Sequence, residues 1–201
     1  MRWTIPNALT VLRLFAAPGV PVMFLYFQRP GADWLALGLF VIASLTDWID
    51  GYLARRWGQE SKFGAMLDPI ADKAMVVIAL VVITGYSGMN PWLILPVTVI
   101  LFREVFVSGL REYLGAKAGL LKVTKLAKWK TTAQMLAIAE LFLGTGLGYV
   151  EDLGLQAKHW SASSATQLGL VLIWIAAGLT LWTGIDYFTK ALPHLRGEVK
   201  S

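Results

Sequence analysis

The chain has 201 residues, of which 56% are hydrophobic and 15% are charged. A soluble domain of this size usually has about 25% charged residues, so the composition indicates an integral membrane protein, which we expect to form a single domain over residues 1–201. Cysteine is absent, which excludes a disulfide framework and thiol chemistry. The net charge of +5 does not indicate nucleic-acid binding, because the positive residues cluster between hydrophobic segments.

Six hydrophobic segments of about 20 residues, each long enough to cross a bilayer as a helix, follow one another along the chain. We therefore predict an all-α, polytopic membrane protein with six transmembrane helices. The first segment is too long for a signal-peptide core and no cleavage site follows it, so we expect it to be retained. The expected spans are Leu9–Phe27, Trp34–Leu53, Ala65–Tyr86, Trp92–Leu114, Thr131–Val150 and Gln167–Phe188.

Positive residues lie mostly on one side of this topology, which predicts that both termini and the second and fourth connections face the cytoplasm. The opposite side has only Arg29 and Lys158, together with Asp33, Glu151 and Asp152. The basic residues of the cytoplasmic side are Arg2, Arg13, Arg55, Arg56, Lys62, Arg111, Lys117, Lys122, Lys125, Lys128, Lys130, Lys190, Arg196 and Lys200.

Four aspartates lie at fixed spacings where the second span ends and the third begins. Aspartates near hydrocarbon are costly, so a functional role with a bound ion is their default interpretation. At about 100° per residue, the small and acidic residues of each helix share one face, and the two faces together predict one acidic pocket. The pattern is Asp47-x2-Asp50-Gly51-x2-Ala54-Arg55-x8-Gly64-x3-Asp68-x3-Asp72.

Carboxylates are hard oxygen ligands suited to Mg²⁺ or Mn²⁺, and four of them can hold two ions. A two-metal site clamps both oxygens of a phosphoryl transfer. The competing interpretation is that these aspartates are solvated helix caps, as the pair Asp68-Pro69 suggests. One capping aspartate is ordinary, but four at this spacing favour the metal site.

The fourth and fifth spans contain cations that need an anionic partner inside the membrane. Arg103 lies within the fourth span, Arg111 lies two turns further on, and Lys128 and Lys130 open the fifth span. These four residues favour an acceptor with a phosphate group. Two alternatives stay open: Glu104 could pair with Arg103 internally, and lipid headgroups could pair with the other three. The sequence does not assign a role to Glu140.

The complete aspartate pattern resembles the signature of the CDP-alcohol phosphotransferases, which implies their membrane fold and a homodimer. Members of this family displace CMP from a CDP-linked substrate with an alcohol, using a divalent metal. By this resemblance, Asp47, Asp50, Asp68 and Asp72 correspond to metal ligands, and Asp72 also to the general base. Gly51, Ala54 and Gly64 correspond to small positions that admit the cytidine nucleotide, and Arg55 to a diphosphate contact.

Outer segments resemble the members of that family that make phosphatidylglycerophosphate in bacteria. These segments are Ile5–Arg13, Arg103-Glu104, Gly109–Glu112 and Lys128–Met135. The resemblance implies transfer from CDP-diacylglycerol to sn-glycerol 3-phosphate at the inner (cytoplasmic) membrane. It assigns Asn7 and Thr10 to the nucleotide lipid, and Arg103, Arg111, Lys128 and Lys130 to the glycerol phosphate.

Three other functions share part of this pattern. A related transferase could use inositol phosphate, serine or phosphatidylglycerol as the acceptor. An intramembrane prenyltransferase also uses paired aspartates and Mg²⁺, but at a different spacing. A cation transporter would place its acidic residues near the bilayer midplane, whereas these aspartates lie at the ends of the expected spans.

Overall fold

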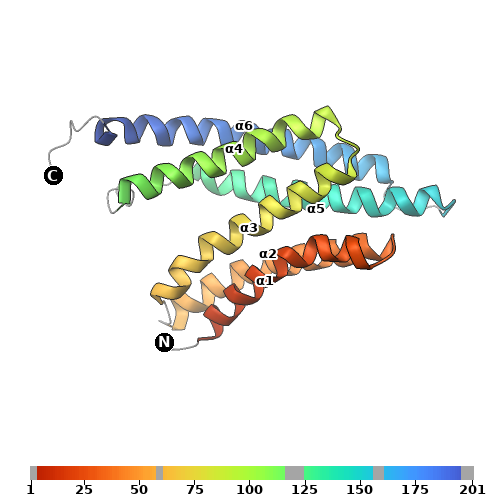
Figure 1. Ribbon diagram of the computed structural model, residues 1–201, viewed down its shortest axis with the longest axis horizontal. Helices are drawn as coiled ribbons and strands as arrows, with labels where there is room; N and C mark the ends of the chain where they lie inside the picture. Colours follow the sequence, from red (N-terminus) through yellow and green to blue (C-terminus); the bar gives the residue numbers. More distant parts are fainter. Residues whose placement is uncertain (1–3, 58–60, 116–124, 156–160, 196–201) are drawn as a thin grey trace.

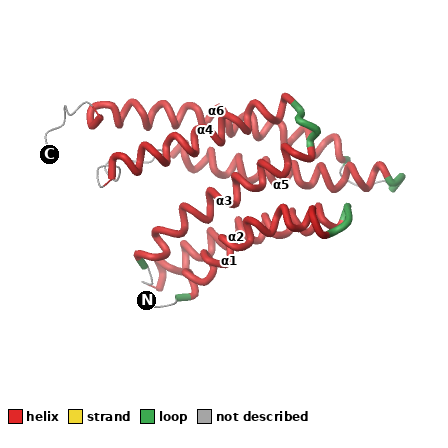
Figure 2. Tube along the Cα trace, viewed as in Figure 1, coloured by secondary structure: helices red, strands yellow, loops and turns green. Residues whose placement is uncertain are grey.

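The computed structural model describes residues 4–57, 61–115, 125–155 and 161–195, which form six α-helices. They are α1 (Ile5–Tyr26), α2 (Gly31–Trp57), α3 (Lys62–Tyr86), α4 (Pro91–Leu114), α5 (Lys125–Asp152) and α6 (Ala162–Leu195). No strand is present in these ranges (Figure 2). The all-helical prediction is confirmed, and each helix extends beyond the hydrophobic stretch that predicted it or matches it closely.

Local sequence signals explain where several helices begin. Thr4 caps α1, Ser61 caps α3 and Asn90 caps α4, each by accepting a hydrogen bond from a backbone N–H in the first turn. Such side chains satisfy N–H groups that have no partner within the helix. Because α3 already begins at Lys62, Asp68 and Pro69 lie inside this helix, and the interpretation of Asp68 as a helix cap is wrong.

The helices form two groups, which meet where α2 packs on α5 and where α3 packs on α4 and α5. Helix α5 packs along α6, α4 packs on α6, and α1 packs on both α2 and α3. In Figure 1, α4, α5 and α6 lie in the upper part of the view, α1 and α2 lie below them, and α3 runs diagonally between the groups. The beginning of α1 and the ends of α2, α4 and α6 all lie toward the left of that view.

Large side chains fill the centre of the molecule, and small residues allow close helix contacts around it. The fully buried residues include Phe40, Met75 and Phe142 from three different helices. A Cβ on Gly169 of α6 would lie 2.8 Å from Leu141 Cγ and 3.1 Å from the Leu141 backbone nitrogen. This glycine therefore lets α5 and α6 approach with their backbones nearly in contact.

The described residues contain four stretches that are long and apolar enough to cross a membrane. They lie in α1, α4, α5 and α6, and run over Asn7–Tyr26, Pro91–Leu114, Trp129–Asp152 and Ala162–Leu195. Together with exposed large hydrophobic side chains such as Phe15, Phe102 and Trp182, they indicate a multi-pass membrane protein. That α2 and α3 also cross the bilayer stays a prediction.

Candidate active site

Three helices bring the aspartates of the pattern to one place. On α1, Arg13 donates through Nη1 to Asp47 Oδ1 of α2 at 2.5 Å and to Asp72 Oδ1 of α3 at 2.7 Å. One turn earlier on α1, the Thr10 hydroxyl donates to Asp68 Oδ1 at 2.7 Å. These side-chain bonds join residues 34 or more positions apart in the sequence, and all of them reach one face of α1.

Burial differs sharply across this cluster. The Arg13 side chain is 2% exposed, whereas the Asp47 and Asp72 side chains are 42% and 41% exposed. The guanidinium thus contacts the two carboxylates from the protein interior, and the other side of each carboxylate is accessible. Such an arrangement holds the carboxylates in place from the buried side and leaves their exposed side open to a ligand.

The donor set fits a hard divalent cation. Two carboxylate oxygens from different helices already converge on a single positively charged nitrogen, so the backbone places both where one cation can contact them. Among the side chains described, no group of three or more His, Cys, Asp and Glu lies close enough to hold a metal ion. The remaining aspartate of the pattern, Asp50, lies on α2 one turn after Asp47.

Several predicted residues lie where the structure describes only the helix path. These are Asp50, Gly51, Ala54 and Arg55 of α2 and Lys128 of α5, whose side chains are outside the described part of the chain. Their predicted roles in metal, nucleotide and glycerol-phosphate binding therefore stay predictions. The continuous helix does place Asp50 three residues after Asp47 and close to the same face.

Gly64 and Asn7 join the start of α3 to α1. The Ser61 hydroxyl donates to Asn7 Oδ1 at 2.8 Å and accepts from the Gly64 backbone N–H at 2.9 Å. Asn7 is only 3% exposed. A Cβ on Gly64 would lie 2.7 Å from Asn7 Oδ1. The close contact between α1 and α3 therefore requires glycine at this position, whether or not a nucleotide also needs the space.

Two of the predicted phosphate-binding cations, Arg103 and Lys130, form a second cluster around Glu104. Lys130 Nζ of α5 lies 2.6 Å from Glu104 Oε1, and Arg103 Nη1 lies 3.0 Å from the same oxygen. The internal partner considered for Arg103 is therefore present in the structure. Arg111 makes neither of these contacts in the described residues; its guanidinium lies 5.9 Å from the centre of the Tyr187 ring.

Two residues join these clusters without having been predicted as site residues. Charge bias and family resemblance place Arg13 only among the cytoplasmic residues, although a cation inside an apolar segment is itself a signal for a buried anionic partner. Lys73 follows Asp72 directly and donates a hydrogen bond to the Ser108 hydroxyl of α4. Its signal in the sequence was the same: a lysine well inside a hydrophobic span.

Comparison with known proteins shows the family of the chain. Residues 3–182 match the family model for CDP-alcohol phosphatidyltransferase. A protein of Cereibacter sphaeroides is 69% identical over 98% of this chain and all of its own length. Proteins of Pseudomonas fluorescens (40% identical, 96% of this chain and 93% of the relative) and Haemophilus influenzae (36%, full length of both) are also similar. All three bear the name CDP-diacylglycerol–glycerol-3-phosphate 3-phosphatidyltransferase.

Proposed function

Because the chain belongs to the CDP-alcohol phosphatidyltransferase family, we propose that it transfers the phosphatidyl group of CDP-diacylglycerol to sn-glycerol 3-phosphate. The products are phosphatidylglycerophosphate and CMP, in the synthesis of phosphatidylglycerol. The observation that supports this most strongly is the convergence of Asp47 and Asp72 on one cationic nitrogen, within a chain that aligns over nearly its whole length with relatives bearing that name.

The acidic cluster supplies the metal site in this proposal. Asp47, Asp50, Asp68 and Asp72 would hold two Mg²⁺ or Mn²⁺ ions, which when bound neutralise the diphosphate of the donor. Arg13 and Thr10 orient three of these carboxylates through the bonds described above. Arg55 contacts the diphosphate, and Asn7, Thr10, Gly51, Ala54 and Gly64 line the nucleotide.

Asp72 acts as the general base. As the 1-hydroxyl oxygen of glycerol 3-phosphate bonds to the β-phosphorus, its proton passes to the Asp72 carboxylate. The bond between that phosphorus and the bridging oxygen breaks, and its electron pair leaves with CMP. The Asp72 side chain is well suited to this role because it is held from below by Arg13 and remains 41% exposed on its other side.

The same proposal places the molecule in the inner (cytoplasmic) membrane as a single six-span domain and a homodimer. The bias of Lys and Arg puts both termini and the aspartates on the cytoplasmic side. There the lipid donor reaches the site laterally from the bilayer, and the soluble acceptor reaches it from water. A prenyltransferase does not fit the Asp50-Gly51-x2-Ala54-Arg55 spacing, and a transporter does not require a base beside a nucleotide site.

Release of CMP from labelled CDP-diacylglycerol by the purified protein tests this function. We expect release with glycerol 3-phosphate and Mg²⁺ or Mn²⁺, far slower release with serine, inositol phosphate or phosphatidylglycerol, and none in EDTA. Faster release with another acceptor would show that this chain catalyses the reaction of a different member of the family. Undiminished release in EDTA would refute the metal site, and the absence of release with every acceptor would favour a transporter.

A further inference from the structure

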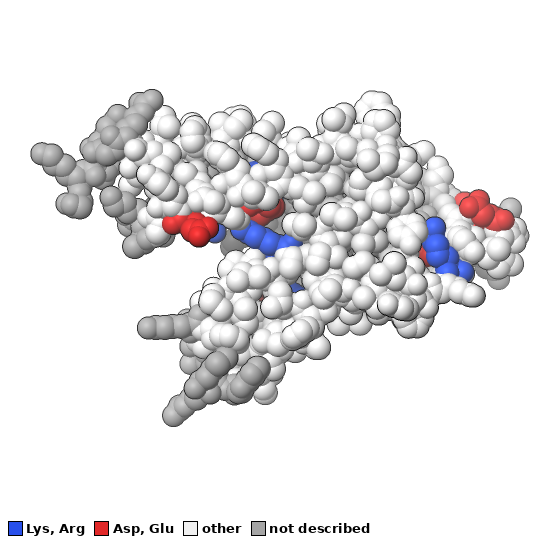
Figure 3. Space-filling view, viewed as in Figure 1, with Lys and Arg blue, Asp and Glu red and all other residues white. Residues whose placement is uncertain are grey.

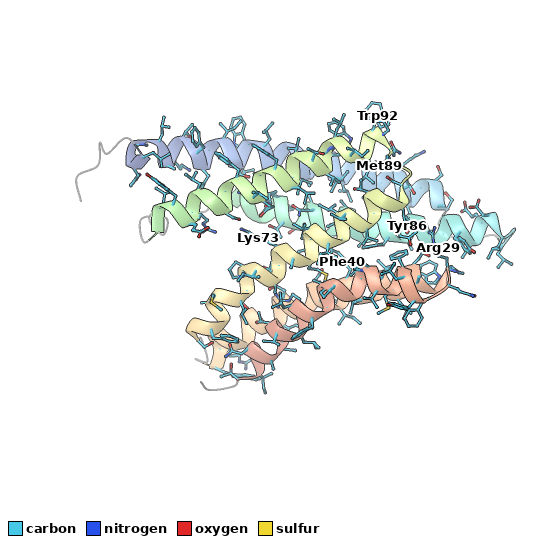
Figure 4. The ribbon with its side chains drawn as sticks, in the orientation of Figure 1. Arg29, Phe40, Lys73, Tyr86, Met89 and Trp92 are labelled. Atoms are coloured by element: carbon cyan, nitrogen blue, oxygen red, sulfur yellow. The ribbon has the colours of Figure 1, made fainter. Side chains whose placement is uncertain are left out.

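A cluster of cations that includes Lys73 lies between α3, α4 and α5. Lys73 of α3 interacts electrostatically with Glu104, Arg103 and Arg111 of α4, and Lys130 of α5 interacts with Glu104, Arg103 and Lys73. Among the described residues, three positive side chains thus interact with the Glu104 carboxylate: Lys73, Arg103 and Lys130. Figure 3 shows basic and acidic atoms together in a hollow between the two helix groups, and Figure 4 places Lys73 between α3 and α4.

Glu104 neutralises only part of this charge. Its Oε1 accepts from both Arg103 and Lys130, so its single negative charge is shared between two cations. The Lys73 ammonium donates to the Ser108 hydroxyl, and that hydroxyl donates in turn to the Glu104 backbone carbonyl at 2.5 Å. Within the described part of the chain, Lys73 therefore has a neutral hydrogen-bond partner, Ser108, and two N–H donors left for a ligand.

The position of Lys73 makes this arrangement costly without a further anion. It lies 11 residues after the first residue of α3, which is about 16 Å along the helix. Its side chain is partly buried. In the proposed six-span topology, a cation at this position is expected to pair with an anion or to line a polar pathway. Glu104, the carboxylate with which Lys73 interacts, is already bound by two other cations.

Asp72 and Lys73 point to opposite neighbours of α3. Asp72 bonds to Arg13 of α1, whereas Lys73 bonds to Ser108 of α4, as expected for consecutive helical residues about 100° apart. Glycerol 3-phosphate has its attacking hydroxyl and its phosphate at opposite ends of three carbons. A molecule lying across this edge of α3 would meet the base with one end and the ammonium with the other.

We propose that Lys73 binds the phosphate of the acceptor, and that this contact selects glycerol 3-phosphate over acceptors without a phosphate at that position. Glu104 is a positioning residue in this arrangement, since it holds Arg103 and Lys130 beside the same site. The inference rests on the proposed function and adds to it a contact from α3, next to the base.

Steady-state kinetics of Lys73→Gln test the proposal. Loss of a charged hydrogen bond should raise the KM for glycerol 3-phosphate about ten- to hundredfold, with the KM for CDP-diacylglycerol within twofold of the wild type. Lys73→Arg should restore most of the affinity. Lys190→Gln is the matched control: Lys190 bonds to Asp186 on the exposed end of α6, so removing its charge should change neither KM.

The two KM values decide whether Lys73 binds the acceptor phosphate. An unchanged KM for glycerol 3-phosphate in Lys73→Gln, or an equal rise in both KM values, overturns the role of Lys73. If Lys73→Gln does not fold, Lys73→Met, which also removes the charge, decides: a raised KM for glycerol 3-phosphate alone supports the contact, and two unchanged KM values overturn it. If the wild type forms no phosphatidylglycerophosphate, the proposed function itself fails and this inference fails with it.

Discussion

Arg13 determines how two aspartates from different helices face each other. Its buried guanidinium contacts Asp47 and Asp72 at once, so the carboxylates are fixed relative to α1 before any ligand arrives. Removing one partner of such a buried contact usually costs far more than an exposed ion pair contributes. The charge of Arg13 also offsets part of the repulsion between carboxylates that are only a few ångströms apart.

The role of Asp72 as base predicts a specific kinetic change. Asp72→Asn keeps the shape of the side chain but cannot take the proton of the attacking hydroxyl, so we expect kcat to fall about 10²- to 10⁴-fold. The KM for CDP-diacylglycerol should change little, because Asp47, Asp50 and Asp68 remain. Steady-state CMP release measures both.

Asp186→Asn is the control for that variant. Asp186 is an aspartate on the exposed end of α6, bonded to Lys190 at 2.6 Å, and its substitution should leave kcat unchanged. A kcat of Asp72→Asn within a few-fold of the wild type would exclude Asp72 as the base.

At the scale of the helices, the site depends on the contact between α1 and α3. Ser61 begins α3, bonds to Asn7 of α1 and accepts from Gly64. The same pair of helices makes the Thr10–Asp68 and Arg13–Asp72 bonds further along. The start of α3 therefore sets the register in which the aspartates meet α1.

Gly64→Ala should disturb this register. Its Cβ would lie 2.7 Å from Asn7 Oδ1, so Asn7 must move, and overpacking of this kind typically costs about 1–3 kcal/mol. We expect a lower thermal unfolding midpoint in detergent and lower activity. Gly178→Ala is the control, because a Cβ on Gly178 of α6 would meet nothing within 4 Å. Equal midpoints for the two variants would show that α1 and α3 do not need glycine at position 64.

At the scale of the whole molecule, the sequence predicted the helices well and the contacts between them poorly. Hydrophobic segments of membrane-spanning length predicted the all-helical fold, because backbone groups in a bilayer must bond within the helix. The aspartate spacing predicted that Asp47 and Asp72 face a common site. The partners Arg13, Thr10 and Asn7 depend on how α1 packs against α2 and α3, which helical periodicity in one segment does not specify.

The contacts of the second cluster could not be predicted from the sequence for the same reason. Lys130 and Arg103 were predicted as cations of one site, but their shared contact with Glu104 depends on the packing of α4 and α5. Lys73 joins them from α3 for the same reason. The aspartate cluster is thus built by α1, α2 and α3, whereas the second cluster forms only when α3, α4 and α5 come together. Helix α3 contributes a residue to each.

The most direct test of the account is the fate of the oxygen atom of the acceptor. Glycerol 3-phosphate labelled with ¹⁸O at its 1-hydroxyl should react with CDP-diacylglycerol to give phosphatidylglycerophosphate that retains the label in its phosphodiester bridge, together with unlabelled CMP, as measured by mass spectrometry. Asp47→Asn should strongly reduce both products in parallel. Label in CMP, phosphatidylglycerophosphate without label, or undiminished product from Asp47→Asn would contradict the proposed transfer at the aspartate cluster.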